Sequence, residues 1–161
     1  PTVVFIHGVV NDHSVWVLQS RYLAHHGWNV LAVDLPGHCR SEGEAPSSVE
    51  EAAAFIGALL DAAGVGKAAL VGHSWGSLIA LEAASRLRER ISHLVLDPRD
   101  GRHGAYLSAL YDRERASRSA PFRLHAPNEY APKPGDLVCT GSAGPTWVKR
   151  SLEKSVPVVS S

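Results

Sequence analysis

The pentapeptide Gly72-His73-Ser74-Trp75-Gly76 stands between an apolar run at residues 68–71 and a helix-like run at 77–84. A strand, then Gly-x-Ser-x-Gly, then a helix is the local context that a nucleophile elbow requires. A serine on so sharp a turn takes up a strained backbone, and bulky neighbours on either side would clash. The pattern predicts that Ser74 is a catalytic nucleophile; the alternative is a tight turn with an incidental serine.

Short apolar runs alternate with helix-like segments on both sides of this turn. Strands are expected at residues 2–6, 28–34, 68–71 and 91–97. Helices are expected over residues 14–26, from Ser47 to Gly64, and from the elbow to about Arg90, with Ser47 and Glu50 as a capping box. This alternation predicts an α/β fold, with an open parallel sheet and helices on both faces.

A change of composition after Pro98 predicts a domain boundary. Residues 1–98 carry the regular pattern and form the expected core. Residues 99–161 are rich in Arg, Ser, Gly and Pro, and only 136–139 and 156–159 look strand-like. We therefore expect an irregular C-terminal tail.

Composition narrows the classes of partner. The 161 residues carry a formal net charge of zero, so bulk charge does not favour nucleic acid or an anionic membrane as a partner. No apolar stretch approaches the roughly 20 residues that span a bilayer, and no signal peptide is evident, so we expect a cytoplasmic protein. Cys39 and Cys139 are interpreted as free thiols, and the nine scattered histidines predict no metal cluster. We expect no cofactor.

Acyl transfer also needs donors for the oxyanion that forms on the substrate. The Trp75 amide follows the nucleophile at the start of a helix. His7-Gly8-Val9 ends the first strand, and ligands in open α/β sheets bind at the carboxyl ends of strands. We therefore predict an oxyanion hole formed by the amides of Val9 and Trp75, with Val9, Val10, Trp75 and Trp16 as an apolar pocket wall.

Four segments carry a family resemblance: residues 5–8 (Phe-Ile-His-Gly), 34–41, 72–76 and 94–98. Together they resemble the α/β-hydrolase superfamily, in the esterase and acyl-hydrolase branch that includes proline iminopeptidase-like and lactone- or ester-cleaving members. The resemblance covers residues 2–97. It implies that residues 29–34, 2–6, 68–71 and 91–96 are strands four, three, five and six of the family, giving the sheet order 4-3-5-6.

Two departures from the family pattern stand out. Cys39 occupies a position where the family usually has glycine, and a side chain costs about 1 kcal/mol there if φ is positive. The family supplies its catalytic acid and histidine after strands seven and eight, and no such strands are evident here. The remaining candidates are Asp97 as the acid and His103 or His125 as the base, and the chain can also lack a base.

The other histidines receive no catalytic role. The resemblance implies structural or pocket-lining roles for His7, His38 and His73, whereas His13, His25 and His26 are expected to be exposed.

The tail carries a second, shorter resemblance. Residues 122–139, including Pro134-Gly135-Asp136-Leu137, look like a segment of uncharacterised bacterial proteins related to CHAP-type Cys-His amidases. Cys139 lies within the expected strand and receives no role. The two resemblances imply a hydrolase front half joined to an unrelated tail, by natural fusion, frameshift, misassembly of the sequence or engineering.

These observations lead to a hypothesis of function. We expect a serine hydrolase that cleaves a small ester or related acyl substrate through an acyl-enzyme on Ser74. The alternative is an α/β-hydrolase-like domain that lacks a base and acts only in binding, or has no function; a third interpretation is amidase activity in the tail. Missing late strands would leave an exposed sheet edge through which two copies could pair.

Overall fold

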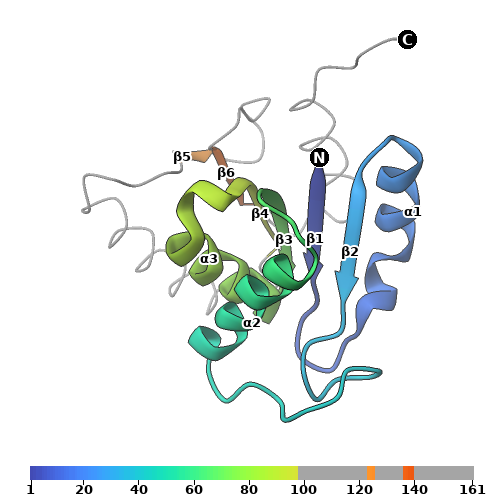
Figure 1. The fold of residues 1–161 in the computed structure, drawn as a ribbon, viewed down its shortest axis with the longest axis vertical. Helices are drawn as coiled ribbons and strands as arrows, with labels where there is room; N and C mark the ends of the chain where they lie inside the picture. Colours follow the sequence, from blue (N-terminus) through green and yellow to red (C-terminus); the bar gives the residue numbers. More distant parts are fainter. Residues whose placement is uncertain (98–122, 126–135, 140–161) are drawn as a thin grey trace.

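A parallel sheet of six strands forms the centre of the part that the computed structural model describes, which is residues 1–97, 123–125 and 136–139 (Figure 1). The strand order is β2-β1-β3-β4-β6-β5, and every pairing is parallel. The strands are β1 (Thr2–Ile6), β2 (Asn29–Val33), β3 (Ala68–His73), β4 (Ile91–Asp97), β5 (Arg123–His125) and β6 (Asp136–Cys139). The order of the first four strands confirms the predicted 4-3-5-6 arrangement.

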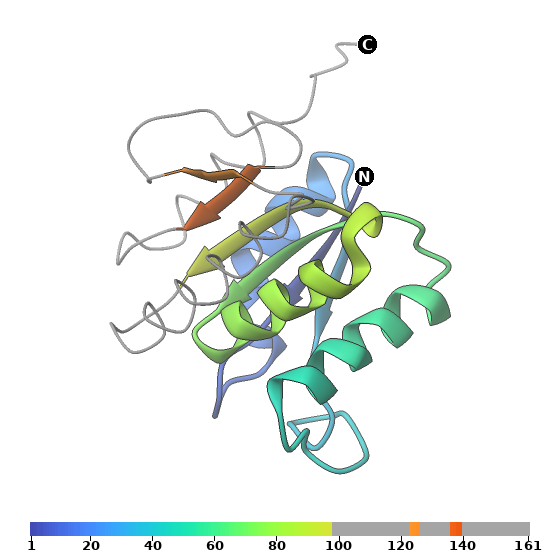
Figure 2. The same ribbon diagram turned by 90° about the vertical axis from the view of Figure 1, so that its left-hand side faces the viewer.

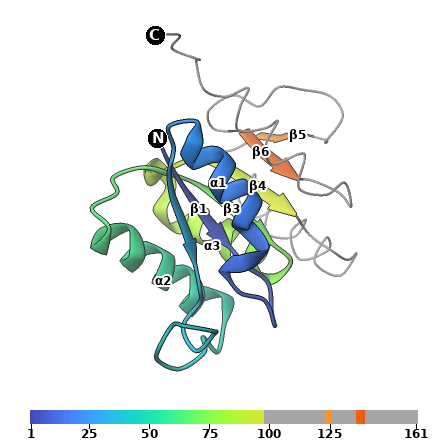
Figure 3. The same cartoon turned by 90° about the vertical axis from the view of Figure 1, so that its right-hand side faces the viewer.

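Helices cover both faces of this sheet, as predicted (Figures 2 and 3). The helical elements are η1 (His13–Trp16), α1 (Val17–His25), α2 (Val49–Ala62), α3 (Trp75–Leu87) and η2 (Arg88–Arg90). The helix expected over residues 14–26 thus begins as a 3₁₀ turn. No helix in the described part of the chain is long and apolar enough to cross a bilayer.

Side chains of β1 alternate between two separate hydrophobic clusters. Val4 and Ile6 pack with residues of α2 and α3, whereas Val3 and Phe5 pack with Trp16 and other residues on the α1 side. Successive side chains of a strand point to opposite faces, so an unbroken apolar run suits a strand that is covered on both sides. All five residues of β1 are buried, which places this strand in the middle of the core.

The start of α2 differs from the prediction by one residue. Ser48, rather than Ser47, is the N-cap, and its hydroxyl accepts a hydrogen bond from the Glu51 amide over 3.1 Å. The Glu51 carboxylate reaches back to Ser47, accepting from its amide over 2.8 Å and from its hydroxyl over 2.9 Å. These two bonds lower the pKa of Glu51. The capping pair is therefore Ser48 and Glu51 rather than Ser47 and Glu50.

The tail contributes two short strands to the sheet. Strand β6, which was expected at residues 136–139, pairs with β4 from Leu94 to Leu96, so it covers the sheet edge that we expected to be exposed there. Strand β5 pairs with the far side of β6 and was not predicted. The strand expected at residues 156–159 lies outside the described residues, and the boundary at residue 98 stays a prediction.

Candidate active site

The backbone turns sharply at Ser74, between the end of β3 and the start of α3. Ser74 has φ +53° and ψ −119°, a conformation that residues with a side chain rarely adopt. The glycines on both sides, Gly72 and Gly76, allow the turn to pack against neighbouring backbone without steric clash. A Cβ on Gly72 would lie 2.6 Å from the Ser77 nitrogen, and one on Gly76 would lie 2.7 Å from the His7 carbonyl oxygen. The strained serine between two sterically required glycines is the local geometry that the sequence motif predicted.

The end of β1 lies directly against this turn. A Cβ added to Gly8 would come within 2.9 Å of the Ser74 Cβ and within 3.2 Å of the His73 carbonyl oxygen. The absence of a side chain at Gly8 therefore allows the β1 loop to approach the serine closely. Ser74 itself is half-buried, so its side chain is partly accessible to solvent.

Hydrogen bonds from β4 and α3 hold the turn in place. The Ser74 amide donates to the Asp97 carbonyl over 2.9 Å, and the Ser77 amide donates to the Ser74 carbonyl over 2.9 Å. The fully buried Ser77 hydroxyl donates to the Gly72 carbonyl over 2.8 Å and accepts from the Asp97 amide over 3.2 Å. The role of Ser77 was not predicted, because its only sequence signal is a hydroxyl in the first turn of a helix, ahead of the apolar residues 78–81.

The residues assigned to the oxyanion hole and the pocket wall lie in different environments. Val9 follows Gly8 and is 54% exposed, Val10 is 93% exposed, and Trp75 is the half-buried first residue of α3. Trp16 is only 4% exposed and stacks on Phe5 with ring centroids 4.8 Å apart. Trp16 therefore belongs to the core beneath the α1 face, which argues against a role as pocket wall.

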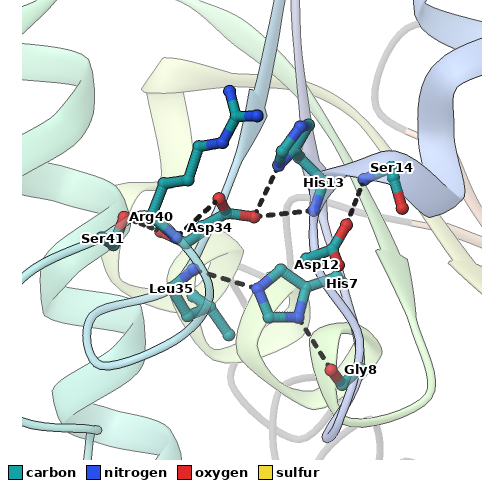
Figure 4. Close-up of polar contacts among 9 residues, drawn as sticks. All are labelled: His7, Gly8, Asp12, His13, Ser14, Asp34, Leu35, Arg40 and Ser41. Atoms are coloured by element: carbon teal, nitrogen blue, oxygen red, sulfur yellow. Dashed lines mark hydrogen bonds and ion pairs between the residues drawn. The ribbon is translucent and has the colours of Figure 1, made fainter.

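His7 links the loop after β1 to the loop after β2 (Figure 4). Its Nε2 accepts a hydrogen bond from the Leu35 amide over 3.0 Å, so Nε2 carries no proton and Nδ1–H donates to the Gly8 carbonyl over 2.8 Å. Burial lowers the pKa of His7, which favours the neutral form that this arrangement needs. The structural role implied by the family resemblance agrees with these contacts.

Asp34 is the centre of a second set of contacts in Figure 4. Its Oδ1 accepts from the His13 amide over 2.8 Å and lies 2.8 Å from the His13 Nδ1. Burial alone would raise the pKa of Asp34, but hydrogen bonds from His13 and Arg40 outweigh it and lower this pKa. His13, which was expected to be exposed, is instead half-buried and has a specific partner.

Three of the four described non-glycine residues with positive φ lie at the carboxyl edge of the sheet, and the fourth, Arg88, is the C-cap residue of α3. Val10, Cys39 and Ser74 have φ values of +59°, +44° and +53°, and they lie in the loops after β1, β2 and β3. Positive φ is uncommon for residues with a side chain and exceptional for a β-branched one such as Val10. Such strain tends to cluster at functional sites. The value at Cys39 explains why glycine is the family's usual residue there.

The predicted acid and bases are placed only in part. Asp97 ends β4, is half-buried, and contacts the elbow through its backbone amide and carbonyl. His103 lies outside the described residues, and only the backbone strand is described at His125. Their assignment as acid and base stays a prediction.

This fold and this turn together define an α/β hydrolase. The sequence model of the family described as alpha/beta hydrolase fold matches residues 1–126, and the chain belongs to this family. The match confirms the resemblance seen in residues 2–97 and extends beyond it. The resemblance of the tail to CHAP-type proteins stays a prediction.

Proteins similar to this chain include a lipase, an epoxide hydrolase and a lactone-degrading enzyme. Lipase LipV of Mycobacterium tuberculosis is 35% identical over 118 residues, which are 71% of this chain and 44% of the relative. An epoxide hydrolase of Caballeronia sordidicola is 36% identical, covering 52% of this chain and 26% of the relative. The structure of Est816, an N-acyl homoserine lactone degrading enzyme, matches with a TM-score of 0.56 and 29% identity, covering 59% of this chain and 37% of that one. The chain spans less than half the length of these relatives.

Proposed function

We propose that this chain carries the nucleophile of a serine hydrolase acting on a small ester or a related acyl substrate. The observation that supports this most is the strained Ser74, half-exposed at the β3–α3 turn and approached by Gly8 from β1. The Ser74 oxygen would bond to the substrate carbonyl carbon. The Ser74 proton would pass to the general base, which would return it to the leaving alcohol. Loss of that alcohol would yield an acyl-enzyme that water then hydrolyses.

The negative charge that develops on the carbonyl oxygen would be bound by two backbone amides. We assign these to Val9 and Trp75. Trp75 begins α3, and the first N–H groups of a helix have no partner within that helix. Val9 follows Gly8, whose backbone lies against Ser74. Donors of this kind contribute on the order of 3 kcal/mol each to transition-state stabilisation.

Exposed apolar side chains beside Gly8 favour a hydrophobic acyl group. Val9 and Val10 are both exposed, and Val15 and Leu18 follow on the next helical elements. The names of two relatives, a lipase and an enzyme that degrades N-acyl homoserine lactones, are consistent with an ester or lactone as the substrate. The general base would be His103 or His125, with Asp97 as the candidate acid.

A fluorophosphonate probe tests this proposal directly, because an activated serine attacks its phosphorus atom, displaces fluoride and becomes phosphonylated. We expect labelling of the wild-type chain at Ser74 and none of Ser74→Ala. Ser47→Ala is the matched control, since Ser47 is an exposed serine remote in sequence from the elbow, and it should be labelled like wild type. Hydrolysis of p-nitrophenyl acetate should be lost in parallel with labelling.

The alternative domain without a base gives a different result. If the wild type binds short-chain esters reversibly but is neither labelled nor hydrolytic, while a control esterase is labelled under the same conditions, the hydrolase proposal is wrong. Labelling that persists in Ser74→Ala would show that another serine reacts, and would also contradict the assignment.

A further inference from the structure

Three potential metal ligands come together at the carboxyl edge of the sheet. The ligand atoms of His13, Asp34 and Cys39 all lie within 4.8 Å of one another. His13 begins η1, Asp34 follows β2, and Cys39 lies further along the loop after β2. No metal cluster was predicted, because the nine histidines are scattered along the sequence. The fold brings His13 to Asp34 and Cys39, which are distant from it in the chain.

The Asp34 carboxylate is oriented by the protein itself. Its side chain is only 6% exposed, and it accepts hydrogen bonds from the amides of His13 over 2.8 Å and Arg40 over 3.4 Å. A solvent-exposed carboxylate would have to be ordered by a metal ion. Here hydrogen bonds within the protein already fix the carboxylate. Hydrogen-bond donors to a ligating carboxylate are common in metal sites.

Cys39 supplies the softest of the three ligands. It is a free, exposed thiol, and its φ of +44° holds a side chain where glycine would be less strained. Thiolate and imidazole favour zinc over magnesium or calcium, which prefer oxygen ligands alone. One nitrogen, one oxygen and one sulfur atom leave a fourth position open to water in a tetrahedral site.

We propose that His13, Asp34 and Cys39 bind a zinc ion, which joins the loop after β1 to the loop after β2. Ligands around one zinc ion are about 3.3–3.8 Å apart, given the usual zinc–ligand bond lengths, so small side-chain rotations suffice. Binding replaces the contact between His13 Nδ1 and Asp34 Oδ1. The Cys39 thiol loses its proton to water. The neutral His13 ring changes tautomer, because the proton that Nδ1 shares with Asp34 Oδ1 must move through solvent to Nε2 before Nδ1 can bind zinc.

Cobalt and zinc titrations test this proposal. With thiols kept reduced, Co²⁺ should produce a sulfur-to-cobalt charge-transfer band and the intense visible absorption of tetrahedral cobalt, and Zn²⁺ should displace it. Cys39→Gly should abolish the band and weaken Zn²⁺ binding by more than about 100-fold, beyond what loss of an outer-shell group costs. This variant relieves positive φ, so loss of binding cannot be ascribed to misfolding.

Two further variants complete the test. Cys139→Ala removes the other cysteine and should keep the band, whereas His13→Gln should weaken Zn²⁺ binding and alter the visible spectrum. A band that is absent from the wild type, that persists in Cys39→Gly, or that is unchanged in His13→Gln would overturn the proposal.

Discussion

The Asp97 backbone amide donates a hydrogen bond to the Ser77 hydroxyl over 3.2 Å, joining the end of β4 to the first turn of α3. The same hydroxyl donates to the Gly72 carbonyl over 2.8 Å. Because Ser74 lies between Gly72 and Ser77, these two bonds close the elbow on the side facing β4. The position of the candidate nucleophile therefore depends on a buried serine that does not react.

Removing the Ser77 hydroxyl should destabilise the protein. Ser77→Ala removes the buried hydroxyl and leaves the Gly72 carbonyl and the Asp97 amide without this partner. We therefore expect the free energy of unfolding to fall by about 1–3 kcal/mol. Urea denaturation measures this loss. Ser20→Ala is the control, since the Ser20 hydroxyl is buried without a hydrogen-bond partner among the described residues and its removal should cost nothing. An equal decrease in the free energy of unfolding of the two variants would contradict a stabilising role for the Ser77 hydrogen bonds.

A methyl group at Gly8 should displace the nucleophile. In Gly8→Ala the new Cβ would lie 2.9 Å from the Ser74 Cβ, so one of the two loops must move. A displacement of about 1 Å between reacting groups costs on the order of 100-fold in rate. We therefore expect fluorophosphonate labelling of Ser74 to slow by about that factor. Gly66→Ala adds a methyl group with nothing within 4 Å and should label at the wild-type rate. A wild-type rate in Gly8→Ala would refute the close approach.

The α2 cap should depend on Ser48 more than on Ser47. Ser48→Ala removes the acceptor of the Glu51 amide, and loss of an N-cap side chain costs about 1 kcal/mol. Ser47→Ala keeps the backbone bond to the Glu51 carboxylate and should cost less. Thermal unfolding of the two variants side by side makes the comparison, and the reverse ranking would restore the cap predicted from the sequence.

Adjacent serines show why local patterns place an element but not its first residue. Ser47 and Ser48 each have a glutamate three residues later, so the capping-box pattern fits both. The choice is made by contacts of the folded chain. In contrast, strand β4 from Ile91 to Asp97 matched the prediction, because its apolar residues lie between the charged end of the preceding helix and Pro98.

Residues that meet across the fold were beyond the reach of sequence patterns. The elbow at Ser74 was predictable because strand, glycines and helix are neighbours in the chain. Other contacts join segments that are distant in the chain, and the periodicity of the sequence does not predict them. These are the contacts of Ser77 with Asp97, of His13 with Asp34, and of β6 with β4. The predictable part of the site is therefore its local turn, and the unpredictable part is what surrounds that turn.

Cys39→Gly should stabilise the chain in metal-free buffer. A side chain at φ +44° is strained, and glycine removes this strain, so we expect a gain of about 1 kcal/mol. Cys39→Ala keeps a Cβ at the same φ and should give no such gain. Unfolding in the presence of a chelator separates this effect from zinc binding. A Cys39→Gly variant no more stable than Cys39→Ala would mean that the loop relaxes around the side chain.

His7 should make the folded state sensitive to acid. Its Nε2 accepts the Leu35 amide and burial lowers its pKa from 6.5, so the folded chain favours the neutral ring. The unfolded chain takes up this proton near pH 6.5. The stability that His7 contributes is therefore complete above about pH 6.5 and declines as the pH falls toward the folded-state pKa.

Two measurements check this expectation. Urea midpoints recorded from about pH 8 to pH 5.5 should decrease below pH 6.5. The His7 ring proton resonance, assigned by its loss in His7→Gln, should titrate with a midpoint below 6.5. A midpoint at or above 6.5 would show that the ring accepts a proton at Nε2 without cost. The Leu35 amide could not then be its hydrogen-bond donor, and the link between the loops after β1 and β2 would need another origin.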